Sequence, residues 1–320
     1  MRRLWGLVAI LAGLAGSAGA QTYPTHPVRL VVTFPAGGAI DVLSRILADK
    51  LSTTIGERVV VDNRAGMGGT LGADVVAKAA PDGYTLVTAS AASHAINKAL
   101  FRTIPYDPEK DFTPVSMFAT LPTVLVINPS LPAKTVSAFI ADAKARPGKI
   151  NYASIGNGSS QHLAGAYFEL KAQVQLTHIP YKTAPGIATD LASNDVQAGF
   201  LFISNIIAFI QSGQVRPLAV TSRQRMPALP EIPTMIEAGL PDYEYTNWFG
   251  VMGPAGLPAA IVAKLHAEIA KACQDADLKK RFDELGALAV GDDPATFGAF
   301  VKAEIPKWAT IVKASGAQID

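Results

Sequence analysis

The sequence predicts an α/β protein made of two doubly wound lobes, which two crossing segments join and which enclose a ligand cleft. Short apolar strands alternate with helical patterns along the middle of the chain, an order typical of parallel sheets covered by helices. Two extended stretches, 121–129 and 243–253, have the character of segments that pass between lobes. The ligand of such a protein lies in the cleft, at the carboxyl ends of the strands. We therefore expect one lobe to contain residues 21–122 and 247–320, and the other to contain 123–246.

Residues 1–20 have the composition of a cleavable signal peptide. An arginine pair at 2–3 precedes the apolar stretch 4–14, and Ala18-Gly19-Ala20 forms a small-residue cleavage site before Gln21. A short membrane anchor is the alternative, but the apolar stretch falls short of the ~20 residues that a span requires. Because glutamine rather than cysteine follows the cleavage site, a lipid anchor is disfavoured. We expect export to the periplasm.

The composition restricts the class of protein. Removal of residues 1–20 from the 320-residue chain leaves 300 residues, enough for two domains, and lowers the formal charge from +2 to about zero. A nearly neutral chain argues against nucleic acid as a partner. The single cysteine, Cys273, follows a helical apolar pattern and is expected in the core. We expect a monomer that an apolar core stabilises.

The first strand and helix flank a glycine turn. The apolar run 28–32 predicts a buried strand, and Ile40, Leu43 and Ile46 follow at helical spacing. Gly37 and Gly38 lie between them and allow close approach to the backbone, since they lack Cβ atoms. A helix start offers unpaired N–H groups and the positive end of the peptide dipole, which favour a carboxylate or phosphate. A tight turn without a ligand is the alternative.

Further strands and helices alternate along the chain. The expected strands are 85–88, 123–127, 175–179 and 218–220. The expected helices are 71–79, 136–145, 161–170 and 187–192.

Small, glycine-rich or hydroxylated turns recur before these helices. They span 64–70, 89–94, 154–160 and 180–185. Ser159, Ser160 and Thr183 are good N-cap residues, so helix capping alone could explain any one turn. The set as a whole suits a polar acid held by backbone N–H groups and hydroxyls.

Motifs of other chemistries are absent from the sequence. The glycines of 66–72 have the wrong spacing for a dinucleotide fingerprint, and neither a phosphate loop nor a G-x-S-x-G elbow occurs. The histidines have no metal-ligand spacing; they are His26, His94, His162, His178 and His266. We expect no metal, no cofactor and no enzymatic activity.

Six short segments occur in order along the chain: 34–41, 63–69, 80–86, 151–154, 161–165 and 180–182. They resemble the successive signatures of the Bug family, the extracytoplasmic solute receptors of tripartite tricarboxylate transporters. The resemblance continues to 219–221 and 232–234 and covers essentially the whole chain after the signal. It implies a periplasmic binding protein fold of the second type. It also implies capture of a small carboxylate, held largely by main-chain groups and ordered waters at the first strand–helix loop, and its delivery to membrane permease subunits.

The candidate ligand-binding residues follow from the turns and from the resemblance. In the first lobe they are Phe34, Ala36, Gly37, Gly38, Asp41, Ser90, Ala92 and Ser93. In the second lobe they are Ser159, Ser160, His162, Tyr181, Thr183 and Ala184. The anionic Asp41 is expected to cap the first helix and order the loop or a water rather than touch a carboxylate. Lys182 either supplies charge or is merely solvated, and Trp248 and Phe249 either line the cleft or pack the hinge.

Leu201 bears on the choice of acid. Relatives often carry an acidic residue in the segment that follows the strand near residue 200, where this chain has Phe200-Leu201-Phe202. Leucine cannot pair with a ligand ammonium group, so we expect an acid without an amine and with an aromatic or aliphatic body between its carboxylates. A Leu201 that points into the core is the alternative. Two other functions stay open: an exported enzyme acting on a carboxylic acid, and a ligand sensor for a membrane signalling protein.

Overall fold

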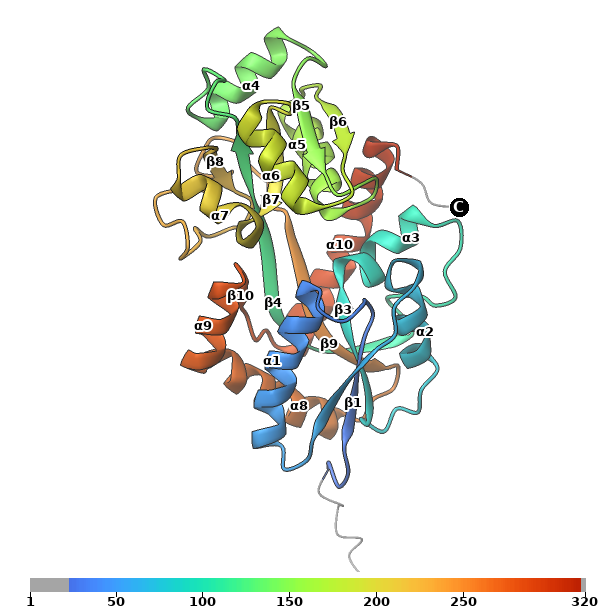
Figure 1. Ribbon diagram of the computed structural model, residues 1–320. Helices are drawn as coiled ribbons and strands as arrows, with labels where there is room; N and C mark the ends of the chain where they lie inside the picture. Colours follow the sequence, from blue (N-terminus) through green and yellow to red (C-terminus); the bar gives the residue numbers. More distant parts are fainter. Residues whose placement is uncertain (1–22, 318–320) are drawn as a thin grey trace, which may run out of the picture.

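The computed structural model describes residues 23–317, so the predicted signal peptide lies outside the described residues. The chain forms two lobes, one above the other in Figure 1. The long strand β4 (Phe112–Ile127) runs through both lobes, and β9 (Thr246–Pro254) returns from the second lobe into the first. These strands occupy the predicted crossings, although β4 begins earlier than the sequence indicated. Among the described residues, no helix combines the length and apolar character that a membrane crossing requires.

The sheet of the first lobe has the strand order β2–β1–β3–β9–β4. Strand β1 (Val28–Val32) pairs in parallel with β2 (Val59–Asn63) and β3 (Thr85–Ser90). Strand β9 is antiparallel to both β3 and β4, and the short β10 (Leu288–Ala289) adds to β4. The parallel strands β1 and β3 therefore end together, at the edge that faces the second lobe.

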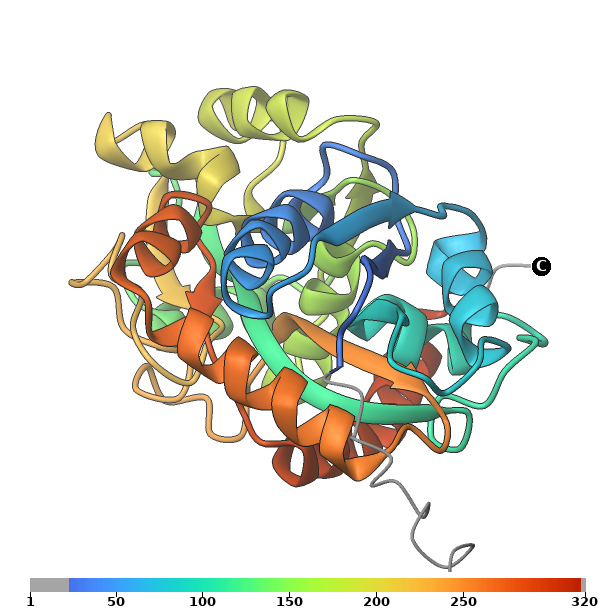
Figure 2. The same cartoon turned by 90° about the horizontal axis from the view of Figure 1, so that it is seen from below.

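Helices cover both faces of this sheet. Helices α1 (Ala39–Thr54), α8 (Ala259–Gln274) and α9 (Ala276–Glu284) pack on one face. The other face carries η1 (Met67–Gly69), α2 (Thr70–Ala77), the π-helical turn η2 (Ala92–Ile96), α3 (Asn97–Leu100) and α10 (Pro294–Ser315). Figure 2 shows the orange α8 alongside the curved green β4. Cys273 is buried in α8, as the sequence predicted.

The second lobe repeats this plan with fewer strands, in the order β4–β7–β5–β6. Strand β5 (Asn151–Ser154) pairs in parallel with β6 (Thr177–Pro180) and β7 (Ala198–Phe202). Strands β7 and β8 (Arg216–Val220) are antiparallel to β4. The helices of this lobe are α4 (Val136–Ala145), α5 (Ser160–Ala172), α6 (Ala184–Ser193) and α7 (Ile203–Gln211).

The sheets are mixed, which corrects the expectation of parallel sheets. Within each lobe, strands such as β1, β3, β5 and β7 run toward the other lobe. A strand that arrives from the other lobe runs in the opposite direction, so β9 is antiparallel to β3 and the second half of β4 is antiparallel to β7. The two connections between the lobes thus impose the antiparallel pairs.

A buried carboxylate ties β9 to α10 behind the cleft. Glu304 is 4% exposed and accepts hydrogen bonds from Trp248 Nε1 at 3.3 Å and from Trp308 Nε1 at 2.6 Å. Trp248 is fully buried and contacts Phe297 edge-on, with ring centroids 5.7 Å apart. Trp248 therefore packs the hinge and does not line the cleft.

Replacement of Gly72 by alanine should destabilise the first lobe. Gly72 lies in α2, and a Cβ atom there would be 2.7 Å from the carbonyl oxygen of Arg64 and 3.0 Å from Thr33 Cα. Because both are backbone atoms, the helix must move away from β1, and we expect a loss of about 1–3 kcal/mol in the free energy of unfolding. Urea denaturation measures this. Val75→Ala is the control in the same helix, at a side chain that is 39% exposed; an equal loss there would contradict the argument.

Candidate functional site: a cleft between the lobes

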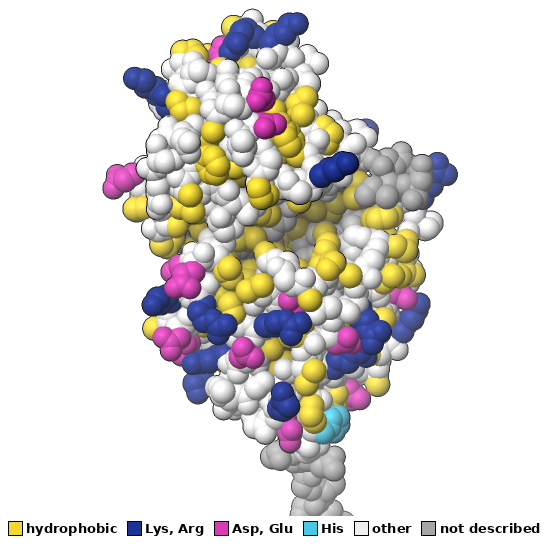
Figure 3. Space-filling model, viewed as in Figure 1, with side chains coloured by type: hydrophobic (Ala, Val, Ile, Leu, Met, Phe, Trp, Pro, Cys, Tyr) yellow, Lys and Arg dark blue, Asp and Glu magenta, His cyan; other side chains and the backbone are white. Residues whose placement is uncertain are grey.

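A cavity of about 580 Å³ lies between the lobes, where β1, β3, β5 and β7 end. Figure 3 shows hydrophobic side chains gathered around the hollow at mid-height of the molecule. The lining from the first lobe is Phe34, Pro35, Ala36, Gly38, Ala39, Ile40, Gly68, Ser90, Ala92, Ile96, Asn97, Leu100 and Phe101. The crossing strands add Leu121, Asn247 and Phe249, and the second lobe adds Ile155, Asn157, Gly158, Ser159, Ser160 and Phe202.

The loop between β1 and α1 presents a helix start to this cavity. Gly37 has φ +85°, a conformation that favours glycine, whereas Gly38 has φ −74° and serves as the N-cap. No side chain caps the helix. The first N–H groups of a helix have no intrahelical partner, and here they belong to residues that line the cavity. The positive end of the α1 dipole therefore faces the cavity.

Asp41 holds this loop in place from below. Its carboxylate accepts a hydrogen bond from Gly37 N at 2.8 Å and another from Asn63 Nδ2 at 2.8 Å. Asn63 Nδ2 also donates to the carbonyl oxygen of Phe34 at 3.0 Å, and Arg45 Nε donates to Asp41 at 3.0 Å. Asp41 is 3% exposed and does not line the cavity. It orders the loop, as expected, but it does not cap α1, because its backbone partner is Gly37 N, which precedes the N-cap Gly38.

The hydrogen bonds also fix the ionisation of Asp41. Burial alone would raise the pKa of the carboxyl group, but the bonds from Arg45, from Gly37 N and from Asn63 outweigh it and hold the pKa below its ordinary value. The group is an anion at neutral pH and an acceptor for all three donors.

The turn after β3 places Ser90 and Ala92 at the cavity, whereas Ser93 does not line it. Ser93 is 1% exposed, and its Oγ accepts from Ser90 N at 3.2 Å and contacts His94 Nδ1 at 2.9 Å. Burial lowers the pKa of His94 to about 3, so this side chain is neutral. Ser93 and His94 support the turn from within the lobe.

In the second lobe, the loop after β5 reaches the cavity through Ser159 and Ser160. Ser159 Oγ caps α5 by accepting from His162 N at 3.3 Å. His162 does not line the cavity: its Nδ1 accepts from Gly158 N at 3.0 Å, and its ring stacks on His178 with centroids 4.0 Å apart. Burial and then the neighbouring His178 lower the pKa of His162 to about 4, which keeps Nδ1 an acceptor at neutral pH.

The start of α6 stays outside the cavity, contrary to the sequence expectation. Tyr181 donates its hydroxyl to Asp190 at 2.6 Å, within the same lobe. Thr183 is the N-cap of α6, and Ala184 begins the helix. None of the three lines the cavity, and neither does the exposed Lys182. Thr183 occupies the N-cap position without a side-chain cap bond, so this turn begins a helix that does not face the cavity.

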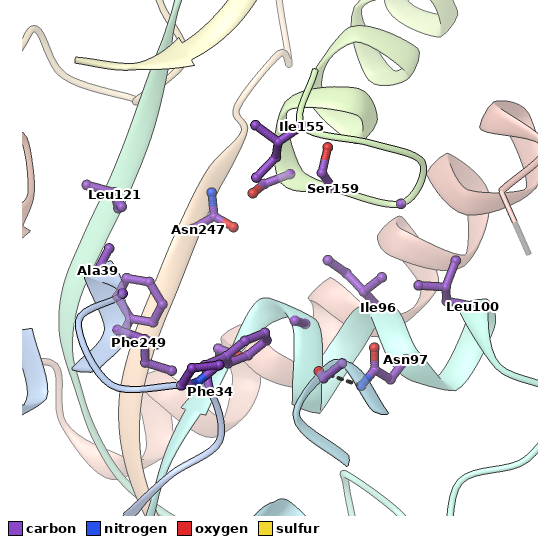
Figure 4. Close-up of a pocket in the computed structure, with 18 of the residues that line it drawn as sticks. Phe34, Ala39, Ile96, Asn97, Leu100, Leu121, Ile155, Ser159, Asn247 and Phe249 are labelled. Atoms are coloured by element: carbon purple, nitrogen blue, oxygen red, sulfur yellow. Dashed lines mark hydrogen bonds between the residues drawn. The ribbon is translucent and has the colours of Figure 1, made fainter. Parts of the chain in front are cut away.

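Several lining residues were not among the candidates, notably Asn247, Phe202 and Asn97. Phe249 does line the cavity, because residues 247 and 249 share one face of β9 and Trp248 occupies the other. The available signal for Asn247 was an amide side chain in a strand that is apolar apart from Thr246. Asn97 Nδ2 donates to the Gly68 carbonyl oxygen at 2.9 Å and so braces two lining segments (Figure 4).

Leu201 does not meet the cavity. It is 1% exposed and belongs to the core of the second lobe, with Val124, Ile187 and Leu191. Its neighbour Phe202 lines the cavity instead, since successive strand residues face opposite sides. Leu201 therefore gives no information about the ligand.

The cavity has no ionisable lining. Within residues 23–317, its wall contains no aspartate, glutamate, lysine, arginine or histidine. The groups of the wall that can form hydrogen bonds are the N–H groups at helix starts, the serine hydroxyls, and the amides of the backbone and of the asparagine side chains. Such a wall can hold an anion through N–H groups but offers no charged partner to a cation.

Asp41→Asn should lower stability at neutral pH. An asparagine cannot accept from all the donors that surround Asp41, and we expect a loss of about 1–3 kcal/mol in the free energy of unfolding. Because the folded pKa is depressed, the stabilisation is present above the unfolded pKa of about 3.9 and is lost as the pH falls through the folded value. The difference between wild type and variant should therefore shrink from pH 7 to pH 3.

Asp62→Asn is the control for this measurement. Asp62 pairs with Arg29 and Arg64 on the surface of β2, with a side chain 28% exposed, and such pairs contribute about 0–1 kcal/mol. Chemical denaturation at several pH values measures both variants. A difference for Asp41→Asn that stays constant with pH would contradict the assignment.

Known proteins resemble this chain over nearly its whole length. The protein BugT of Bordetella pertussis is 38% identical over 323 residues, covering 100% of this chain and 99% of BugT. The solved structure of Rpa4515 of R. palustris with adipate is 37% identical with a TM-score of 0.75, covering 93% of this chain and 100% of that one. MatC from Rhodopseudomonas palustris with bound malate is 32% identical with a TM-score of 0.71, covering 91% and 100% of the two chains.

The family model described as tripartite tricarboxylate transporter family receptor matches residues 43–317. This range contains the second lobe, both crossing strands and most of the first lobe and of the cavity wall, but it begins after β1 and the loop that leads into α1. The proteins of this family are binding proteins rather than enzymes. The chain belongs to the receptor family of the tripartite tricarboxylate transporters, as its resemblance to the Bug proteins had indicated.

Proposed function

We propose that this protein is a periplasmic receptor that binds a small carboxylic acid in the cleft, without converting it, and delivers it to the membrane subunits of a tripartite transporter. The observation that carries the proposal is that the start of α1 faces an uncharged cavity, while Asp41 orders the loop that precedes it. Residues 1–20 are proposed to direct export and to be removed. The solved relatives bound to adipate and malate support a carboxylate as the ligand class.

The carboxylate is proposed to bind at the first turn of α1. Its oxygens accept hydrogen bonds from the N–H groups of residues 38–40, directly or through water, and the helix dipole adds to the attraction. The hydroxyls of Ser90, Ser159 and Ser160 are near enough to the same cavity to complete the contacts. A buried carboxylate without such partners would be costly, so the cleft must supply them when it closes.

Closure is proposed to occur about the two crossing strands, with residues 21–122 and 247–320 as one lobe and 123–246 as the other. Apolar side chains from both lobes face the cavity and are partly open to solvent: Phe34 from the first lobe and Phe202 and Ile155 from the second, Ile155 being 43% exposed. Burial of such surface favours the closed state, and closure about a hinge is a known response to ligands.

The ligand is proposed to lack an amine. The reason is the absence of a carboxylate from the described cavity wall, not Leu201. An ammonium group enclosed there would lose its hydration and gain no charged partner, which costs several kcal/mol. An amine-free acid has no such group to bury.

A thermal-shift screen of mono-, di- and tricarboxylates tests the proposed function. A ligand that binds only the folded state stabilises it by about 2.7 kcal/mol at one hundred times its Kd. We expect at least one acid to raise the melting temperature in proportion to the logarithm of its concentration, and to be recovered unchanged after incubation. A screen in which no carboxylate shifts the melting temperature would sink the proposal.

The adjacent glycines provide matched variants for the same screen. Gly38→Val places a side chain at the cavity with its Cβ 3.6 Å from the nearest atom, and its φ of −74° suits valine. We expect binding to weaken at least about tenfold, with a stability change below about 1 kcal/mol. Gly37→Ala, at φ +85°, should instead cost about 1–2 kcal/mol of stability. Loss of binding and of stability in equal measure at Gly38 would mean that it is only a turn residue.

Matched acids test the selection against an amine. Succinate and aspartate, and likewise glutarate and glutamate, differ only by an ammonium group. Titration calorimetry should show tighter binding of the amine-free member of each pair that binds, by about tenfold or more. If an amino acid binds more tightly than every amine-free acid tested, the proposal about the ligand is wrong.

A further inference from the structure

Asn247 is the one polar side chain that the crossing strands place at the cavity. It lies on β9 opposite Leu121 of β4 and shares its face of the strand with Phe249. In Figure 4 the amide lies between Phe249 and Phe34 on the first-lobe side and Ile155 and Ser159 on the second-lobe side.

The amide of Asn247 has no partner among the described residues. Its Nδ2 is buried without a hydrogen-bond partner, whereas buried polar groups are nearly always paired. The other lining asparagine of the first lobe differs, since Asn97 Nδ2 is bonded to Gly68 and to Thr70 Oγ1 at 3.0 Å. Because no protein group holds the Asn247 amide, half a turn about its Cβ–Cγ bond can bring Nδ2 to the cavity without breaking a protein hydrogen bond.

We propose that Asn247 determines specificity by donating Nδ2 to a second oxygen acceptor at the far end of the ligand. This inference rests on the proposed function, in which the first carboxylate is held at the start of α1. The space between these two points is walled by Phe34, Phe249 and Leu121. The ligand class is therefore an acid with an apolar body and a distal carboxylate or carbonyl oxygen.

Pairs of acids that differ only at the far end measure this contribution. Succinate and butyrate, adipate and hexanoate, and terephthalate and 4-methylbenzoate each exchange a distal carboxylate for a methyl group. Wild type should bind the two-ended acid of at least one pair about tenfold or more tightly than its partner, as a hydrogen bond to a charged group allows. Asn247→Leu should lose that preference, while the affinity for the one-ended acid changes less than about twofold.

Asn247→Asp is the matched variant of the same shape. Its carboxylate cannot donate and repels the distal carboxylate, so two-ended acids should bind more weakly to it than to Asn247→Leu. The melting temperature of each variant without ligand reports folding, and Asn247→Leu should equal or exceed wild type because a buried unpaired donor is removed.

The outcomes separate the inference from the proposed function. If wild type shows no preference within any pair that binds, or if Asn247→Leu keeps the preference, the inference is wrong and the receptor function stands. Equal weakening of both members of a pair would assign Asn247 a structural role and would also overturn it. If no acid binds wild type at millimolar concentration, the proposed function fails first.

Discussion

The antiparallel pairing of β4 with β9 supports both lobes and the site between them. Strand β4 belongs to the first sheet through residues 112–122 and to the second through 123–127, so one strand fixes how the sheets are connected. Its partner β9 places Asn247 and Phe249 in the cavity wall, where they form the floor of the cleft. Trp248 lies on the opposite side of β9, where Glu304 holds it to α10. The floor of the cleft and the connection between the lobes are therefore the same structure.

In the site above this floor, the ionised side chains are not the groups that line the cavity. Asp41 and Arg45 are ionised, but they act beneath the loop, where Asp41 fixes Gly37 and, with Asn63, orients the start of α1. The described cavity wall itself presents only dipoles and apolar groups. Because fixed dipoles at a helix start need no counter-charge, an anion can be bound without burying an ion pair. Two buried histidines that support the turns are also uncharged, since burial keeps His94 and His162 neutral.

Part of the cavity wall could be predicted because its chemistry is local. Phe34, Ala36 and Gly38 line the cavity, as do Ser90, Ala92, Ser159 and Ser160, and all lie in turns where a strand leads to a helix. The same local chemistry misled at Tyr181, Thr183 and Ala184, because a cap residue has the same sequence pattern whether or not its helix start faces the cleft. Ser93 and His162 were also expected at the cavity. They lie close to lining residues in the chain, but their side chains are buried and accept hydrogen bonds from the backbone of the turns instead.

The sequence by itself determined the α/β class, the alternation of strands with helices, the crossings and the glycine turn before α1, because each depends on residues close together in the chain. Only the tertiary structure decided that the sheets are mixed, that Leu201 faces the core while Phe202 faces the cavity, and that Asn247 lies opposite Leu121 without a partner. These features depend on strand direction and on register between segments far apart in the chain. A shift of one residue in a strand exchanges its two faces, and no local pattern fixes which face meets the other lobe.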